Sequence, residues 1–142
     1  MSQSAETLSI EKLSKMMAKQ DIAMLVTRHG DDSAVRPMSN NREVEFDGDT
    51  HFFTRADTTT VDDIKAHDRV SVTYQDTEDD TFIVLTGTAS LHTDRDTLEE
   101  HWKDELSNWF EDGLETDGLT LVRVDADRVH YWIGRKEGEL TL

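Results

Sequence analysis

Short segments in which apolar and polar residues alternate recur along this chain, and turn residues separate them. Val70, Val72 and Tyr74 show the pattern, in which every second side chain is apolar. Such alternation places the apolar side chains on one face of a β-strand. The chain has a single proline, Pro37, and no proline- or serine-rich linker that would mark a domain boundary. The sequence therefore predicts one mostly antiparallel β domain over residues 1–142, with short helices in the connections.

Three segments show helical features instead. Apolar residues at helical spacing predict a short amphipathic helix over 10–20. The pair Thr60 and Asp63 resembles a capping box and predicts that a second helix begins at Thr60. A third helix is expected to begin after Asp94 and to carry an apolar stripe over 98–110.

The turn residues divide the remaining segments into strands. The expected strands are 22–28, 33–37, 43–46, 50–54, 70–74, 82–91, 119–124 and 129–133. Asp47-Gly48 predicts a tight turn between the third and fourth of them, and Gly87 indicates a bulge or a close approach inside 82–91. Residues 125–127 are expected to form the turn of a closing hairpin. The core then spans about 8–133, and 134–142 is expected to be a loosely held tail.

The charge balance narrows the range of partners. The chain has 15 Lys and Arg against 31 Asp and Glu, a formal net charge of −16. Such a surface repels nucleic acid and anionic lipid, so neither is predicted as a partner. No apolar stretch approaches the roughly 18 residues that a membrane-spanning helix needs. The N-terminus lacks the basic and apolar regions of a signal peptide, so a soluble cytoplasmic protein is expected.

The acidic residues are spread along the chain rather than gathered in a tail. A dispersed acid excess with few lysines suits a protein that works in concentrated salt, because dissolved ions screen its self-repulsion. The sequence therefore indicates salt adaptation. A moderately acidic mesophile surface is the alternative.

Several kinds of chemistry lack their motifs. The absence of cysteine excludes disulfides, thiol nucleophiles and zinc sites that need sulfur. The chain contains no GxGxxG, Walker loop, GxSxG or HExxH sequence. Its 6 histidines lie in different expected elements without paired spacing, so no metal site is predicted. No general acid or base stands out, and the catalytic residues stay unassigned.

Two segments combine groups that suit a flat, phosphorylated ligand. In Arg36-Pro37-Met38-Ser39 a cation and an apolar side chain meet beside an extended proline, and a guanidinium pairs well with phosphate. Phe52-Phe53-Thr54 is followed by Thr58-Thr59-Thr60 at a predicted helix start, where hydroxyls and free amides form an anion site. The alternatives are a surface position for Arg36 and a simple helix cap for the threonines.

These segments belong to a longer pattern. Its pieces are Thr27, Arg36-Pro37-Met38, Phe52-Phe53-Thr54, Ile64, Val70, Gly87, Ala89, Trp102, Trp109-Phe110, Gly113 and Tyr131-Trp132. In this order they resemble the general stress protein branch of the pyridoxamine 5′-phosphate oxidase-like, FMN-binding split barrels. The resemblance runs from about residue 8 to residue 133, nearly the whole chain.

The resemblance implies a six-stranded antiparallel split β-barrel that forms a homodimer and binds FMN at the interface. The cofactor-binding residues it implies are Arg36, Met38, Ser39, Phe53, Thr54, Thr59, Thr60, Trp109 and Trp132. The two tryptophans would approach the flavin ring from the partner subunit. The alternative for these aromatic residues is packing in the core or between subunits, because 98–110 forms an apolar stripe at helical spacing.

One position departs from the family pattern. Relatives usually carry a lysine where this chain has Thr60, so one charge-assisted contact to the phosphate is absent. The candidates to replace it are Arg36, Arg42, Arg55 and Lys65.

The implied function is that of a flavin-dependent oxidoreductase of the general stress type, with FMN carrying the redox chemistry and NADH or NADPH as the candidate reductant. The alternatives are a flavin carrier or sensor without turnover and a barrel that has lost FMN binding. A third reading is a related barrel that binds another flat cofactor, such as haem or a deazaflavin.

Overall fold

The computed structural model of the chain describes residues 9–40 and 46–142. These residues form one antiparallel sheet of strands β1 (Ile22–His29), β2 (Asp32–Ser39), β3 (Asp49–Arg55), β4 (Arg69–Asp76), β5 (Thr81–His92), β6 (Leu119–Ile133) and β7 (Lys136–Thr141). The helices are α1 (Ile10–Met17), α2 (Thr59–Ala66) and α3 (Arg95–His101), with short 3₁₀ turns at η2 (Asp104–Asn108) and η3 (Gly113–Glu115).

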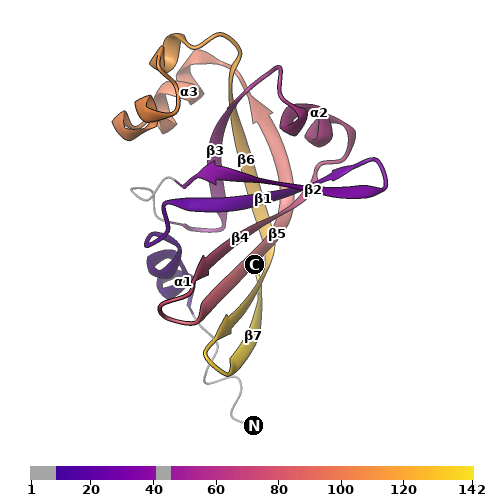
Figure 1. The fold of residues 1–142 in the computed structure, drawn as a ribbon, viewed down its shortest axis with the longest axis vertical. Coiled ribbons are helices and arrows are strands. Elements are labelled where there is room, and N and C mark those ends of the chain that lie inside the picture. The colour runs from indigo at the N-terminus through magenta and orange to yellow at the C-terminus, as the bar shows by residue number, and fades with distance from the viewer. Residues whose placement is uncertain (1–8, 41–45) are drawn as a thin grey trace.

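The sheet curls without closing. Its strand order is β2-β1-β4-β5-β6-β3, and β7 pairs with β6 beside this path. Within the part of the chain that the structure describes, no ladder joins the end strands β2 and β3. Figure 1 shows β5 and β6 running along most of the molecule, with α2 and α3 near one end. The predicted six-stranded split barrel is therefore confirmed, and β7 is an additional strand.

Two apolar clusters fill the fold. The larger one lies between α1 and the curled sheet and includes Leu13, Leu25, Val72 and Leu85. The smaller one, here called the β3–α3 cluster, joins β3, β6 and the chain that follows β5; its buried members are Phe53, Leu98, Leu106, Phe110, Leu119 and Leu121. Burying a large apolar side chain stabilises a fold by about 1.5–3 kcal/mol, so this second cluster holds α3 against the sheet.

The third helix is shorter than the sequence predicts. Asp94 caps α3 as expected, accepting a hydrogen bond from the Thr97 amide, but the helix ends at His101. Trp102 has extended backbone angles, and Leu106 lies in the 3₁₀ turn η2. The predicted continuous stripe over 98–110 is thus wrong as a helix. Its apolar side chains still meet in the β3–α3 cluster, because packing against β3 overrides the local helical periodicity.

The predicted closing hairpin and loose tail are also wrong. Strand β6 runs without a break through 125–127, because β5 pairs with it along its whole length. The chain reverses later, at Gly134, and 136–141 returns as β7 in register with β6. The sequence at 125–127 has turn chemistry, but the ladder satisfies its backbone groups and holds it extended.

The close approach predicted at Gly87 is confirmed, and the extra residue of the bulge lies opposite it in β6 rather than inside 82–91. The β5–β6 register shifts between Thr86 and Gly87, and Gly87 pairs with Ala126. A side chain at Gly87 would meet the Asp125 carbonyl oxygen and the Ala126 backbone, so only glycine allows this close approach.

The remaining expectations concern α1, α2 and the segment before β3. Helix α1 begins where predicted but ends at Met17, short of 20. The N-cap of α2 is Thr58 rather than Thr60, because the Thr58 hydroxyl accepts the Val61 amide. Strand β3 pairs with β6; most of the expected partner strand 43–46 lies outside the described residues. No helix in the described parts of the chain is long and apolar enough to cross a membrane.

Candidate functional site

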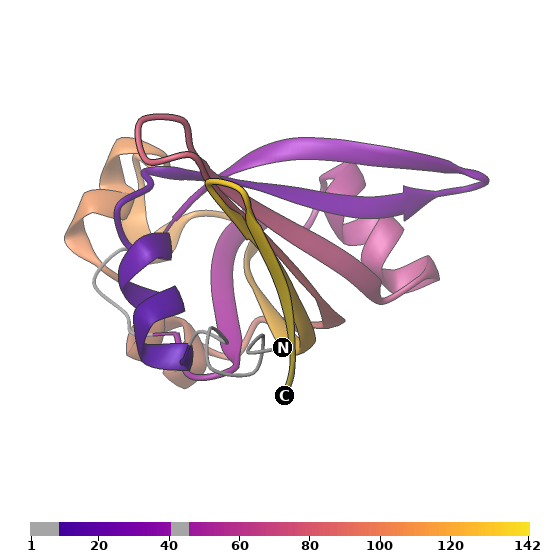
Figure 2. The same ribbon diagram turned by 90° about the horizontal axis from the view of Figure 1, so that it is seen from below.

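A buried carboxylate on α2 joins this helix to the β1–β2 hairpin. The Asp63 side chain is only 4% exposed. Its Oδ2 accepts hydrogen bonds from Arg36 Nη2 at 3.1 Å and from the Thr27 hydroxyl at 2.8 Å, and its Oδ1 lies 2.6 Å from His29 Nδ1. Arg36 Nη1 donates in turn to the Thr27 hydroxyl at 2.5 Å. Figure 2 shows α2 beside this projecting hairpin. We call these four residues the Asp63 cluster.

The Asp63 cluster favours its ionised forms. Burial raises the pKa of Asp63, but the hydrogen bonds from His29, Thr27 and Arg36 outweigh it, so the net pKa is lowered. The hydrogen bond to Asp63 and the charge of its carboxylate raise the pKa of His29. Both directions have the same physical cause, which is that donors around one carboxylate stabilise its charge.

The first turn of α2 presents hydroxyls and amides without partners. Thr59 is exposed, whereas Thr60 is buried at 6% exposure. Among the buried polar side chains of the described residues, Thr60 alone has no side-chain hydrogen bond. A buried hydroxyl normally finds a partner, so this one is free for a ligand. Thr60 and Asp63 are three positions apart on one buried helix face, about 5–6 Å between Cβ atoms.

The end of β3 adjoins this turn. The Thr54 hydroxyl lies 3.4 Å from the Thr58 hydroxyl, so strand end and helix start are in contact. Phe53 belongs instead to the β3–α3 cluster, where it is 9% exposed and packs edge-on against Trp102 at 5.4 Å between ring centroids. Of the two residues, only Thr54 is therefore available to a ligand at α2.

Met38 and Ser39 lie further along β2. Met38 is buried in the larger apolar cluster, so its side chain fills the core. Ser39 lines a pocket of about 180 Å³ together with Trp109, Ile22 and Asp21. Trp109 is 54% exposed, the expected state of an aromatic side chain that meets a ligand or a second subunit.

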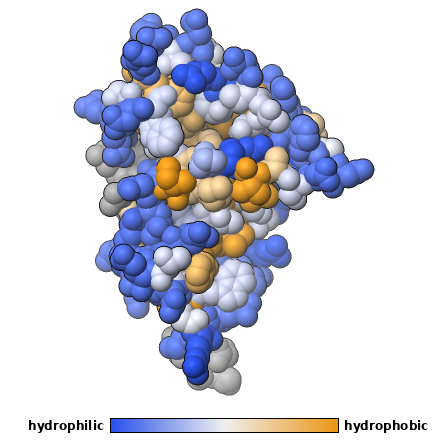
Figure 3. Space-filling model, viewed as in Figure 1, coloured by the Kyte–Doolittle hydropathy of each residue, from blue (hydrophilic) through white to orange (hydrophobic). Residues whose placement is uncertain are grey.

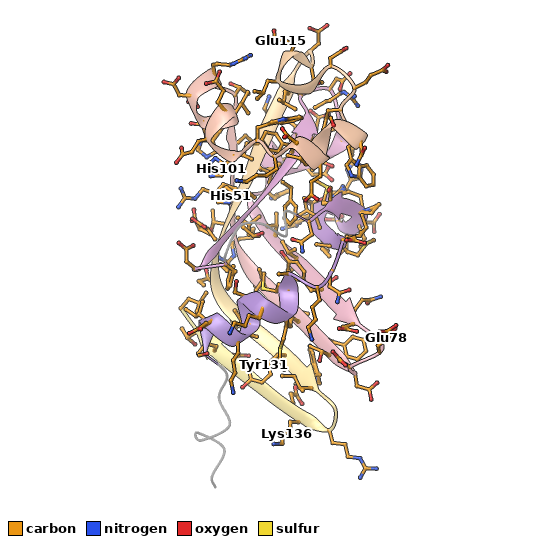
Figure 4. All side chains as sticks on the ribbon, turned by 90° about the vertical axis from the view of Figure 1, so that its left-hand side faces the viewer. His51, Glu78, His101, Glu115, Tyr131 and Lys136 are labelled. Carbon is orange, nitrogen blue, oxygen red and sulfur yellow. The ribbon has the colours of Figure 1, made fainter. Side chains whose placement is uncertain are left out.

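Trp132 lies at the far end of β6. Thr54 pairs with Thr120, and β6 from Thr120 to Trp132 spans roughly 40 Å at about 3.3 Å per residue. Figure 4 places Tyr131, the neighbour of Trp132, at the end of the molecule away from His51 and His101. Trp132 stacks on His130 with ring centroids 4.2 Å apart. Within one chain it cannot meet the residues at α2.

The structure therefore separates the nine predicted site residues into groups. Arg36 reaches α2 at Asp63, Thr54 contacts the N-cap Thr58, and Thr59 and Thr60 form the first turn of the helix. Ser39 and Trp109 share a second pocket, and Met38, Phe53 and Trp132 reach neither place.

The role of Asp63 and His29 is not apparent from the sequence. The pair Thr60 and Asp63 has capping-box spacing, which indicates only a local role for Asp63. Its actual partners lie more than 25 positions away in β1 and β2. The one signal in the sequence is Arg36. The residues around it predict a partly buried strand, and a buried cation requires a carboxylate partner.

A second polar groove lies between β3 and α3. Figure 4 shows His51 on β3 beside His101 on α3, and their ring centroids are 4.2 Å apart. Both histidines line a cavity of about 420 Å³, and Asp49, His92 and Arg123 are among its other lining residues. Burial, with the nearby positive charges of His101 and Arg123, lowers the pKa of His51 to about 4.

This lowered pKa predicts a pH dependence of stability. Between about pH 6.5 and pH 4, His51 is protonated in the unfolded chain but stays neutral in the folded protein. The free energy of unfolding therefore falls as pH falls. Because His51 is only half-buried, we expect a loss of about 1–2 kcal/mol rather than the full value of the shift. Urea unfolding of His51→Asn should show a weaker acid dependence than the parent. The matched control, His67→Asn at the exposed end of α2, should retain the parent's dependence.

The fold agrees with the comparisons to known proteins. The model of a family described as pyridoxamine 5′-phosphate oxidase like matches residues 9–141. The chain belongs to this family. Within the family, the chain is similar to solved structures of general stress proteins, as the sequence resemblance predicts.

Three proteins illustrate what the chain is similar to. A general stress protein 26-related protein from Clostridium acetobutylicum superposes with a TM-score of 0.82 at 18% identity, over 94% of both chains. The general stress FMN/FAD binding protein of Xanthomonas citri has a TM-score of 0.75 at 26% identity, over 89% of both chains. Protein bli-3 of Neurospora crassa is 26% identical over 137 residues, and the match covers 89% of this chain but 66% of that protein.

Proposed function

We propose that the protein is an FMN-binding flavoprotein and a flavin-dependent oxidoreductase of the general stress type. The observation that carries the proposal is the buried, unpartnered hydroxyl of Thr60, one helical turn from Asp63, the carboxylate that binds the cation Arg36. Membership of a family that includes a general stress FMN/FAD binding protein supports the choice of ligand.

The residues around α2 suit a phosphate. The helix ladder begins with the Asp62 amide, which donates to Thr58, so the amides of Thr59 and Thr60 precede it and point toward the helix start. Together with the Thr60 hydroxyl and Arg36, they make an anion site from neutral donors and one cation. Thr54 extends the same surface along β3.

Bound FMN would supply hydride and electron transfer, for which NADH or NADPH is the proposed reductant. The chain's own residues would bind and orient it: α2 and Arg36 would hold the phosphate, and the pocket beside Ser39 and Trp109 would receive an aromatic group. The Asp63 cluster keeps the Arg36 guanidinium in one orientation.

The second proposed feature is a homodimer. Figure 3 shows apolar side chains across the middle of the face where β1 and β2 lie, and Val35 of β2 and Ile22 of β1 are exposed. Trp109 is exposed as well, and Trp132 could take part in a flavin site only from a second copy. Exposed apolar side chains that gather on one face mark an interaction site.

Light scattering on purified protein should therefore give twice the chain mass of 16.2 kDa at micromolar concentration. Val35→Glu places a charge on the proposed interface and should shift the mass toward the monomer. Thr77→Glu, in the exposed β4–β5 turn, adds the same charge elsewhere and should leave the dimer intact. A monomeric parent protein would contradict the proposal.

An alternative function is favoured by one observation. Asp63 already compensates the charge of Arg36, and the net charge of −16 repels a dianion, so the barrel is a candidate for a flavin carrier or a form that has lost FMN. Colour separates these readings: a reductase is yellow and is bleached by NADH or NADPH, a carrier is yellow and stays so, and a cofactor-free barrel is colourless.

The phosphate position has its own test. Restoring an ammonium with Thr60→Lys should tighten FMN binding about tenfold, because a charge-assisted contact contributes about 1.5–3 kcal/mol. Thr59→Lys, at the exposed neighbouring position, repeats the test without burying the new side chain. Fluorescence titration with FMN and with riboflavin gives the readout, and riboflavin should not respond. Thr77→Lys controls for net charge; unchanged FMN binding in both α2 variants would exclude this turn as the phosphate site.

A further inference from the structure

One carboxylate controls the charge at the proposed phosphate site. Asp63 is shared between Arg36 on β2 and His29 on β1, and each contacts a different carboxylate oxygen. Because a carboxylate only accepts, His29 Nδ1 is the donor and Nε2 is the position that gains or loses a proton. The His29 ring is 62% exposed, so this proton exchanges with water.

The geometry also fixes Arg36. Its Nη1 donates to Thr27 and its Nη2 to Asp63, while the Thr27 hydroxyl donates to Asp63 as well. This closed set of three hydrogen bonds leaves the guanidinium no alternative orientation without breaking a buried bond. Asp63 is thus placed to position Arg36 and to cancel its charge.

The charge of the Asp63 cluster then depends on His29. With His29 neutral, Arg36 and Asp63 sum to zero; with His29 protonated, the cluster carries one positive charge. The charged groups that face His29 are Asp63 from α2 together with Asp32 and Arg36 from β2. Asp32 is exposed and favours the protonated form, and Arg36 opposes it.

We propose that Asp63 is the positioning residue of the flavin phosphate site and that, with His29, it makes phosphate binding there stronger when His29 is protonated. This inference rests on the proposed function. It adds to that function a residue that holds Arg36 and a control of affinity by pH. The pKa of His29, raised above its ordinary value by Asp63, favours the protonated form of the ring.

The experiment measures FMN and riboflavin affinity at about pH 6 and about pH 9 in the parent and in His29→Gln. The ratio of the two proteins' affinities cancels the protonation of the FMN phosphate itself, whose second pKa is about 6. When the pH is lowered from 9 to 6, the ratio of the parent's FMN affinity to that of His29→Gln should rise on the order of threefold. The same ratio for riboflavin should not change. His67→Gln should behave as the parent does.

A second variant separates positioning from mere structure. Asp63→Asn keeps the shape and an acceptor for Arg36 but removes the negative charge. FMN affinity in Asp63→Asn should therefore exceed the parent value at pH 9, and the pH dependence that remains should be that of the FMN phosphate alone. A purely structural role for Asp63 would lower FMN affinity instead, at both pH values.

The outcomes distinguish the two proposals. If the parent binds FMN but its ratio to His29→Gln does not change with pH, the control by His29 is wrong while flavin binding stands. If the parent binds neither FMN nor riboflavin, the proposed function fails and this inference fails with it. NMR titration of His29 in the parent and in Asp63→Asn adds a readout without flavin: an identical pKa in both would overturn the coupling.

Discussion

Gly87→Ala should destabilise the protein by about 3 kcal/mol or more, because a methyl group there would lie 2.7 Å from the Ala126 Cα and closer still to the Asp125 carbonyl oxygen. Both atoms belong to the backbone of β6, which cannot move aside as a side chain could. Urea unfolding monitored by Trp fluorescence measures the effect.

Thr88→Ala is the matched control for Gly87→Ala. Thr88 is the next residue of β5 and is exposed, so its truncation should cost less than about 1 kcal/mol. Equal effects of the two substitutions would mean that the bulge tolerates a side chain. The close approach at Gly87 would then not be what shapes this part of the sheet.

Arg36→Met should have the second large effect on stability. It leaves Asp63 buried without its cation, and breaking a buried ion pair by removing one partner is strongly destabilising. Because Thr27 and His29 still donate to Asp63, we expect a loss of about 2–4 kcal/mol at neutral pH. The measurement is the free energy of unfolding in urea.

Adding Asp63→Asn to Arg36→Met should recover part of that loss, since the unpaired charge is then gone. Asp63 has a lowered pKa in the parent, so its ionised form stabilises the fold above the ordinary Asp pKa, and this contribution is lost as pH falls through the lowered value. In Arg36→Met the dependence of the free energy of unfolding on pH that Asp63 causes should weaken or reverse. A double variant as unstable as the sum of the two single changes would show that the residues do not interact.

Local pattern predicted the strands in which apolar and polar residues alternate without a turn-like interruption. Strands β1, β4 and β5 match the expected 22–28, 70–74 and 82–91 to within two residues. The predicted turn at 125–127 is wrong because the bulge opposite Gly87 lets these turn-like residues stay within β6. The sequence of one strand can indicate a bulge, but it does not show which other strand pairs with it.

The candidate site was predicted in part for the same reason. Arg36 and Thr60 each stand out as residue types, and the family resemblance places both near a phosphate. Their connection through Asp63 depends on α2 packing against β1 and β2, a contact between distant segments. The break of the 98–110 stripe has a similar origin, since Phe53 of β3 decides where Trp102 and Phe110 must lie.

The pairing of β3 with β6 has a consequence for the order of folding. It joins Asp49 to Asp125 and Arg55 to Leu119, positions far apart in the chain, so closing this ladder carries a large loop entropy and comes late. Helix α2 lies within the loop that this step closes. A flavin phosphate at α2 would therefore find its binding residues assembled only after the slowest contacts have formed. A bound cofactor would then lower the rate of unfolding without raising the rate of folding.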